Sequence, residues 1–359
     1  MKKIILVVIF MIGVLGLPQT QACTGITLQT ADGLSVTART IEWATEPLSA
    51  MYVVVPRGQQ QHSWLPDSTN LGKSFTADYG YVGIAVENDE FIMEGINEVG
   101  LAAGLFYFPD YGEYMPYKEA DKSICVSDMQ FVAWVLSTCA TIDELIALMP
   151  TIRVIGIDSR ASTVHWRITE PSGRQVVVEL VNQEVKIHEN PWGVLTNSPE
   201  FTWHLTNLNN YVNLVTGSIH QHAVGLFNLM AFGGGSGLHG LPGDMTPPSR
   251  FVRAAFFQST APRLETPEQT IAQAFHLLNN FDIPIGIQFN DTNLVPNMPS
   301  ATQITVATDL PNRRIYYRTM YNSTIRCIDL NTIDFNRVKF QAKPLEYNQE
   351  EPIEFLDIN

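Results

Sequence analysis

Cys23 is the residue on which the chemistry of this sequence depends, because it directly follows a segment with the features of a removable leader. Cleavage after Ala22 would leave a first residue that carries a thiol and a free α-amine together. A free thiol is mostly protonated at neutral pH and needs help to attack an amide. An α-amine has a reference pKa of about 7.7–8, which suits a base near neutrality. An N-terminal cysteine would therefore combine nucleophile and base in one residue.

The segment before Cys23 has the pattern of an export signal. Lys2 and Lys3 precede an apolar run over residues 4–17, and residues 20–22 form a small-residue cleavage site. The run is shorter than the about 20 apolar residues of a membrane-spanning helix, and no later stretch qualifies. We therefore expect a soluble bacterial protein, periplasmic or secreted after removal of residues 1–22, without a stable membrane anchor.

Charge and cysteine content narrow the function classes further. Loss of residues 1–22 leaves 337 residues and moves the formal charge from -14 to -16. This acidity argues against a nucleic-acid partner and against adsorption to anionic lipid. The remaining cysteines, Cys125, Cys139 and Cys327, allow at most one disulfide, and the sequence does not say which. No cysteine or histidine cluster has zinc spacing, so we expect neither a metal nor another cofactor.

The elements that would position Cys23 occur in blocks of strands and blocks of helices. Alternating apolar residues around Asp32-Gly33 predict a hairpin with strands over 24–29 and 35–41. Further strands are predicted over 51–56, 79–87, 91–96, 101–108, 163–169, 175–181, 186–188, 193–196, 302–308, 314–318 and 324–328. Helices are predicted over 127–138, 141–149, 249–258 and 266–279. Residues 59–76 are predicted to be a loop. Such blocks favour an α+β fold of antiparallel sheets with helices outside.

Five motifs, taken in order along the chain, closely resemble the choloylglycine hydrolase family. They are Cys23-Thr24-Gly25 and residues 38–43, 95–101, 195–199 and 240–251. That family comprises bile salt hydrolases and penicillin V acylases, which are N-terminal-nucleophile (Ntn) hydrolases. The resemblance extends to about Asn331. It implies the Ntn-hydrolase fold, a four-layer αββα sandwich of two antiparallel sheets, in one domain over 23–340 followed by a surface tail over 341–359.

The resemblance also implies roles for four residues. Cys23 matches the nucleophile, and Arg39 matches an arginine beside the thiol, where a guanidinium favours the thiolate. Asn197 matches an asparagine whose side-chain amide helps to form the oxyanion hole, and Arg250 matches a second active-site arginine. Without the resemblance, the two arginines would be interpreted as ordinary ion-pair or solvated residues, and Asn197 as a turn residue.

Two further site positions depart from the bile salt hydrolase pattern. Glu42 stands where the family usually has an aspartate that bonds the α-amine and the thiol, so the role is expected but the fine geometry differs. Tyr107 stands where bile salt hydrolases tend to have asparagine and penicillin V acylases tyrosine. The family uses the backbone N–H of this position in the oxyanion hole, which any residue except proline supplies. The Tyr107 side chain is expected to shape the acyl pocket.

Together these features predict an exported cysteine amidohydrolase that cleaves a linear amide with a bulky apolar acyl group, such as a conjugated bile salt or penicillin V. One alternative is an acylase for N-acyl-homoserine lactones or other N-acyl amides. A papain-like cysteine hydrolase would need a separate catalytic histidine, and a binding protein that retains the fold has only Glu42 in its favour. The resemblance also suggests a homo-oligomer, a dimer or a tetramer.

Overall fold

The hairpin predicted at the start of the mature chain forms around Asp32-Gly33, where Gly33 has a φ of 88° that favours glycine. The computed structural model describes residues 22–45, 47–66, 71–157, 162–285, 287 and 298–358, so the expected export signal over residues 1–21 lies outside the described part. In the hairpin, β1 (Cys23–Gln29) pairs antiparallel with β2 (Ser35–Thr45), and Cys23 lies opposite Ile41.

This hairpin belongs to a five-stranded antiparallel sheet in which distant parts of the chain meet. The order is β1, β2, β16 (Met298–Asp309), β17 (Arg314–Thr319) and β18 (Asn322–Asp329). Strand β16 pairs with β2 along most of its length, with irregularities on either side of Ala301 and Thr302. The C-terminal third of the chain therefore supports β2, the second strand of the hairpin that carries Cys23.

The second large sheet has eight antiparallel strands. Their order is β13 (Glu184–Glu189), β12 (Gln175–Val181), β11 (Val164–Thr169), β8 (Ala102–Tyr107), β7 (Ile92–Asn97), β6 (Tyr81–Val86), β3 (Ala50–Val55) and β19 (Gln341–Pro344). Every residue of β6, β7, β11 and β12 is buried. A strand buried on both faces must be covered on both sides, here by the other sheet and by helices.

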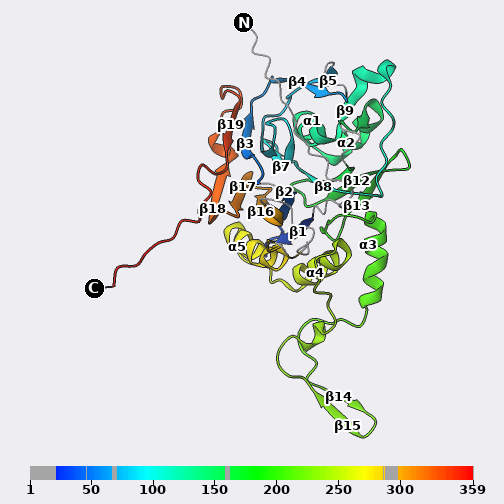
Figure 1. The fold of residues 1–359 in the computed structure, drawn as a ribbon, viewed down its shortest axis with the longest axis vertical. Coiled ribbons are helices and arrows are strands. Elements are labelled where there is room, and N and C mark those ends of the chain that lie inside the picture. The colour runs from blue at the N-terminus through cyan, green and yellow to red at the C-terminus, as the bar shows by residue number, and fades with distance from the viewer. Residues whose placement is uncertain are drawn as a thin grey trace.

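Helices cover the outer faces of both sheets (Figure 1). Helices α1 (Phe131–Thr138) and α2 (Ile142–Leu148) lie on the eight-stranded sheet, whereas α4 (Pro247–Thr260) and α5 (Pro267–Leu278) lie on the five-stranded one. Helix α3 (Phe201–Asn207) packs beside α4. The short 3-10 helices are Glu119–Ile124, Asp128–Gln130, Met149–Thr151, Leu208–Tyr211, Ser236–Leu238, Asn279–Phe281 and Leu330–Thr332. The predicted α+β four-layer αββα sandwich is confirmed.

The prediction of a loop over residues 59–76 is wrong. The segment contains a hairpin of β4 (Gln60–Trp64) and β5 (Leu71–Thr76). Its inward positions include Gln61, which donates to Ser137 Oγ, and Ser63, whose Oγ accepts from Ser127 N at 2.7 Å. Because polar side chains occupy the buried face, the apolar alternation that identifies a strand is missing.

Other segments also differ from their predicted form. Residues 193–196 form no strand, and only Leu195 makes an isolated bridge, to Gly25 of the five-stranded sheet. Residues 341–344 form β19, so the sheet continues four residues past the predicted domain end. The remaining strands are β9 (Cys125–Ser127), which is parallel to β10 (Arg153–Ile155), and the hairpin of β14 (Gln221–Val224) and β15 (Phe227–Met230).

All four cysteines of the chain lie in the described part and are free: Cys23, Cys125, Cys139 and Cys327. None of the helices described in the structure is long and apolar enough to cross a bilayer. Within the same part of the chain, no three histidine, cysteine or carboxylate side chains gather in a way that could hold a metal ion.

Candidate active site

Cys23 is the first residue of β1 and is almost completely buried, with 2 % of its surface exposed. It is anchored from both sides of the peptide bond that precedes it. The Ala22 carbonyl accepts a hydrogen bond from Glu42 N at 3.2 Å, and Cys23 N donates to Asn197 Oδ1 at 2.9 Å. The nitrogen that cleavage would convert into an α-amine is thus already held at a defined place next to the thiol.

Arg250, at the start of α4, clamps the same end of β1. Its Nη1 donates to the Cys23 carbonyl at 2.6 Å and to Thr24 Oγ1 at 2.8 Å, while its Nη2 donates to Asn197 Oδ1 at 2.7 Å. The Asn197 amide orientation follows from these contacts, because its Oδ1 faces two donors and only an oxygen can accept both. Its Nδ2 donates one hydrogen to the Tyr107 carbonyl at 2.7 Å and keeps a second hydrogen for another acceptor.

Tyr107, the last residue of β8, brings the second sheet to the thiol. Its backbone N–H donates a hydrogen bond to the Cys23 sulfur, which lowers the pKa of the thiol. The Tyr107 side chain, half-buried, interacts with Ser162. The N–H predicted for the oxyanion hole therefore lies against the nucleophilic atom, and the Asn197 amide lies on the carbonyl of the same residue.

Opposing effects set the ionisation of the thiol. Burial raises the pKa of Cys23 above its ordinary value, and the Arg39 guanidinium is the strongest influence that lowers it. The Glu42 carboxylate raises the pKa of the thiol, and Arg250 lowers it. Because burial dominates, the resting thiol is protonated and attack requires a base to take its proton.

Glu42 is the carboxylate of this site. Burial raises its pKa to about 7, and Arg250 is the largest influence in the opposite direction. Thr302 Oγ1 of β16 donates to Glu42 Oε1 at 2.8 Å, whereas Oε2 has no hydrogen-bond partner among the residues that the structure describes. The longer side chain is accommodated, and one of its oxygens is available to a donor such as the amine that cleavage would create.

Arg39 lies fully buried in β2 and is held by the second sheet. Its Nη1 donates to the carbonyls of Met93, at 3.1 Å, and Leu105, and its guanidinium carbon lies 3.9 Å from the centre of the Phe106 ring. This distance is typical of a cation–π contact. These contacts hold the guanidinium in a fixed position, from which its charge lowers the pKa of the Cys23 thiol.

Two charged residues that the sequence interpretation missed complete this support. Glu94 of β7 lies 3.6 Å from Arg39 Nη1 and 3.6 Å from Arg167 Nη2 of β11, so one carboxylate serves two buried guanidinium groups. Gly104 of β8 leaves the space for it, since a Cβ there would lie 2.0 Å from Glu94 Oε2. Both residues could have been found as the one Asp, Glu, Lys or Arg in each of the buried strand sequences IMEGIN and VHWRIT.

The structure thus brings together all six residues predicted for the site, namely Cys23, Arg39, Glu42, Tyr107, Asn197 and Arg250. Their individual roles stay predictions. The arrangement offers a buried thiol, an adjacent backbone nitrogen, two donors aimed at one region and fixed positive charge. Such a set can form and stabilise an acyl-thioester.

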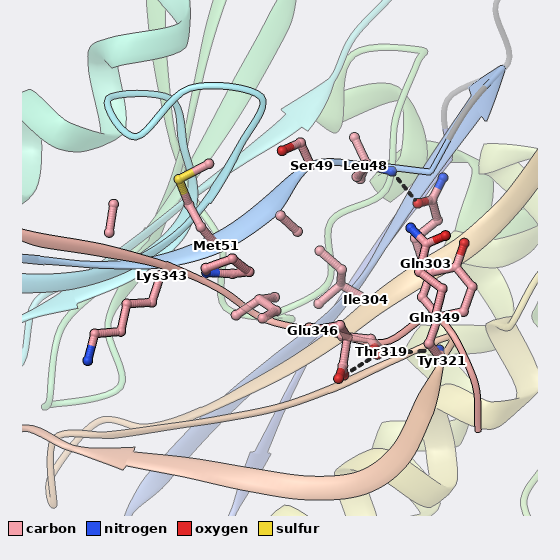
Figure 2. Close-up of a pocket in the computed structure, with 14 residues that line it drawn as sticks. Leu48, Ser49, Met51, Gln303, Ile304, Thr319, Tyr321, Lys343, Glu346 and Gln349 are labelled. Carbon is pink, nitrogen blue, oxygen red and sulfur yellow. Dashed lines mark hydrogen bonds between the residues drawn. The ribbon is translucent and has the colours of Figure 1, made fainter. Parts of the chain in front are cut away.

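A pocket of about 320 Å³ is lined by other residues than these six. Its walls are the start of β3, Gln303 and Ile304 of β16, and the C-terminal segment (Figure 2). Thr319 Oγ1 donates to Glu346 Oε1 at 2.6 Å and fixes that segment. None of the six candidate residues lines the pocket, so we assign it no part in the chemistry.

Comparison with known proteins agrees with the architecture. Residues 23–344 match the profile of a family described as linear amide C–N hydrolases, choloylglycine hydrolase family. A bile salt hydrolase/transferase from Clostridium perfringens (strain 13 / Type A) is 31% identical over 325 residues, which cover 88% of this chain and 95% of that protein. One from Lactiplantibacillus plantarum is 29% identical over 273 residues, which cover 74% and 82%.

Solved structures show the same likeness. A cysteine-to-alanine variant of the conjugated bile acid hydrolase from Clostridium perfringens superposes with a TM-score of 0.79 at 29% identity, covering 93% of this chain and 100% of that one. The penicillin V acylase from Agrobacterium tumefaciens gives a TM-score of 0.73 at 24% identity, covering 91% and 93%. The second likeness concerns the fold alone.

Proposed function

This chain belongs to the choloylglycine hydrolase family of linear amide C–N hydrolases, and from that membership we propose that Cys23 becomes the N-terminal nucleophile after export. The substrate is a linear amide with a bulky apolar acyl group. The observation that carries the proposal is the position of Cys23 N, which is held at 2.9 Å from Asn197 Oδ1 beside its own thiol. Once freed by cleavage after Ala22, this nitrogen is a base with a fixed place.

The contacts support a mechanism in two steps. The neutral α-amine takes the thiol proton, and the Cys23 sulfur attacks the substrate carbonyl carbon. The developing oxyanion accepts hydrogen bonds from the Tyr107 N–H and the free hydrogen of Asn197 Nδ2. The ammonium then gives its proton to the leaving nitrogen, and the C–N bond breaks to leave a thioester. In the second step, the amine deprotonates a water that attacks the thioester, and the acid and the free thiol are released.

Glu42 and Arg250 orient the amine in this scheme. Arg250 holds both the Cys23 carbonyl and the Asn197 oxygen to which the nitrogen donates. The unpaired Oε2 of Glu42 is assigned to a second hydrogen of the amine, which leaves the nitrogen lone pair for the thiol proton. A papain-like alternative needs a histidine at the sulfur. His165 and His204 instead bond to backbone carbonyls behind Asn197.

Two variants among the solved bile acid hydrolase structures support the pairing of Cys23 with Arg39. One replaces a cysteine by alanine and the other an arginine by leucine, and the two positions lie sixteen residues apart in that chain. Cys23 and Arg39 have the same spacing. We assign both residues to the catalytic centre on this basis and on the electrostatic influence of Arg39 on the thiol.

For the substrate, conjugated bile salts and penicillin V are the two candidates. The curated relatives named above are bile salt hydrolases, which favours an acyl group of the bile acid type. Tyr107 favours an aryl-acyl group, because its half-buried ring stands at the end of the strand that reaches the thiol. Hydrolysis of the amide bond of N-acyl-homoserine lactones or other N-acyl amides is the second candidate function, since the same geometry serves any linear amide.

We propose export from the pattern of residues 1–22, which supports a location in the periplasm or outside the cell. The mechanism requires removal of residues 1–22 or an equivalent cleavage, because an amide nitrogen at Cys23 is not a base.

We propose that the protein assembles as a homo-oligomer. The β14–β15 hairpin extends from the body (Figure 1), and large apolar side chains on and beside it are exposed: Leu226, Phe227, Leu229, Met230 and Phe232. Such a surface is typical of a subunit contact. Light scattering of the wild type and of Phe227→Asp tests it, and two equal monomer masses would contradict it.

The test of the function begins with intact mass and N-terminal sequencing of the exported protein. Hydrolysis of penicillin V and of a glycine-conjugated bile salt is then measured for the wild type, Cys23→Ala and the control Cys327→Ala, which changes an exposed cysteine. We expect a Cys23 terminus and a loss of turnover in Cys23→Ala alone. Full activity in a form with one extra residue before Cys23 would refute the amine as base, and a terminus elsewhere would refute the nucleophile.

A further inference from the structure

Three buried polar side chains behind the site have no part in the mechanism above. They are His165 of β11, Glu179 of β12 and His204 of α3, and each is completely buried. Buried polar groups are costly unless they are hydrogen-bonded, so their partners indicate what they support. Glu179 bonds to His165 and lies 3.7 Å from His188 Nε2, and the other hydrogen-bond partners lie on or next to the short segment that carries Asn197.

The two histidines hold consecutive backbone carbonyls. His165 Nε2 lies 3.1 Å from the Thr196 carbonyl, and His204 Nε2 lies 2.9 Å from the Asn197 carbonyl. A carbonyl oxygen only accepts, so each Nε2 must carry a hydrogen. Flat stacking fixes both rings: His165 lies 4.6 Å from the Phe108 ring at 8°, and His204 lies 4.7 Å from the Phe251 ring at 11°.

The contact with Glu179 limits the protonation states that the His165–Glu179 pair can adopt. Its Oε1 lies 3.0 Å from His165 Nδ1 and also accepts from Phe201 N at 3.0 Å. With Nε2 committed as a donor, the Nδ1 contact needs either an imidazolium with a carboxylate or a neutral imidazole with a carboxylic acid. In both forms the pair shares one proton and His165 still donates to Thr196. The support of the segment is therefore independent of which partner holds the proton.

His204 also donates a hydrogen bond from Nε2, but as a neutral ring without a carboxylate partner on Nδ1. Burial lowers its pKa to about 4, so the ring is neutral at working pH. The hydrogen on Nε2 then leaves Nδ1 as an acceptor, and Nδ1 has no hydrogen-bond partner among the described residues. The unpaired Nδ1 atom costs free energy in a buried ring. The ring still makes one hydrogen bond, from Nε2 to the Asn197 carbonyl.

We propose that His204 and the His165–Glu179 pair are positioning residues that lock the Thr196–Asn197 backbone, so that the Asn197 side chain keeps its amide aimed at the reacting carbonyl. The Asn197 side chain contacts Cys23 N, Arg250 and the Tyr107 carbonyl at 2.7–2.9 Å. A small rotation of its backbone displaces all three contacts together. This inference rests on the proposed function, because it assigns the oxyanion donor to Asn197.

The test separates oxyanion stabilisation from thiol reactivity. Alkylation of Cys23 by iodoacetamide needs the thiolate but no oxyanion donor, whereas amide hydrolysis needs both. His204→Phe keeps a flat ring against Phe251 and removes the donor, while His204→Gln keeps a side-chain N–H near the Nε2 position. The matched control is His276→Phe, on the exposed face of α5. Alkylation at Cys23 is followed by peptide mass, since the exposed Cys327 is alkylated as well.

In His204→Phe we expect kcat to fall by about 10- to 100-fold, the range for a displaced catalytic group, with KM within about threefold. Cys23 alkylation should stay within about twofold of the wild type, and His204→Gln should recover most of the lost kcat. Parallel losses of alkylation, turnover and thermal stability would reduce His204 to a structural residue and overturn the proposal. Unchanged turnover would overturn it as well.

Two further measurements apply where His204→Phe does not fold or the wild type cleaves no amide. If His204→Phe does not fold, His165→Asn replaces it, because the shorter amide reaches Glu179 but not the Thr196 carbonyl, and the same separation of turnover from alkylation is expected. If the wild type cleaves no amide, the proposed function fails by itself. The lock is then judged by the Asn197 side-chain amide resonances. They should exchange slowly with solvent in the wild type and His204→Gln and rapidly in His204→Phe, and equal exchange in all three would overturn it.

Discussion

Glu94→Gln should destabilise the fold strongly, because it removes the counter-ion that two buried arginines share. The Glu94 carboxylate lies 3.6 Å from Arg39 Nη1 and 3.6 Å from Arg167 Nη2. The side chains of Arg39 and Arg167 are 0% and 1% exposed, so water cannot replace the lost negative charge. The substituted amide keeps the shape of the carboxylate, which isolates the charge from packing.

The magnitude follows from the distances. At an effective dielectric constant of about 20, unit charges separated by 3.6 Å attract by about 4.6 kcal/mol. Desolvation of the three groups offsets much of this in the native protein, but removal of one partner leaves the others unpaired, which typically costs about 3–5 kcal/mol. Arg39 keeps its bonds to the carbonyls of Met93 and Leu105, so we expect the lower end, about 3 kcal/mol.

Urea unfolding of the two proteins measures this loss as a shift in midpoint at constant slope. The matched control is Glu189→Gln at the end of β13. It removes an exposed carboxylate that lies 2.7 Å from Arg174 Nη2. That pair is shorter but solvated, so its loss should cost about 0–1 kcal/mol. Adding Arg167→Leu to Glu94→Gln should recover part of the stability, because one unpaired charge disappears. Equal losses for Glu94→Gln and Glu189→Gln would refute the reasoning.

The remaining predictions concern the site and its packing. Asn197→Ala should lower kcat by about 10²- to 10³-fold in steady-state assays, as for other oxyanion donors, and a loss below about tenfold would contradict that role. In the uncleaved protein the folded pKa of Glu42 is raised from 4.5 to about 7, so its contribution to stability is complete below pH 4.5 and is lost as the pH rises through 7. Urea titrations should show a decline of about 3 kcal/mol, absent in Glu42→Gln and smaller in the cleaved form with its ammonium. Gly104→Ala should lower the melting temperature because its Cβ meets Glu94 at 2.0 Å, whereas Gly243→Ala, with open space, should not; equal shifts would contradict the clash.

Local pattern was sufficient for the elements that carry the nucleophile. The turn signal at Asp32-Gly33 and the alternation on either side predict the β1–β2 hairpin, because a short glycine-containing turn leaves its mark within a few residues. The predicted site residues came from motifs whose order along the chain agrees with a known family. The β4–β5 hairpin was missed since its buried positions are polar and bond to residues far along the chain.

Glu94 and Arg167, the buried charges that hold Arg39 in place, are predictable only if both faces of their strands are known to be covered. Glu94 and Arg167 occupy strands in which every residue is buried, and in such a strand any charge must have a partner inside the protein. Periodicity does not supply that partner, because it specifies a face and not the neighbouring strand. The same holds for His165, because its partners Glu179 and Thr196 lie on other elements and the spacing of the histidines does not predict them.

Charge balance explains why so many ionic groups are buried around one thiol. Arg39 and Arg167 share the single carboxylate of Glu94, which leaves one net positive charge below Cys23, while Arg250 and Glu42 oppose each other beside it. Burial is the strongest influence on the pKa of the thiol, which it raises, and it favours the neutral form. Formation of the thiolate neutralises the excess positive charge, so the cost of ionising a buried sulfur is partly offset in advance by the arginine left without a full partner. The imbalance is therefore a requirement of the site, and a second carboxylate near Arg39 would stabilise the fold at the expense of the nucleophile.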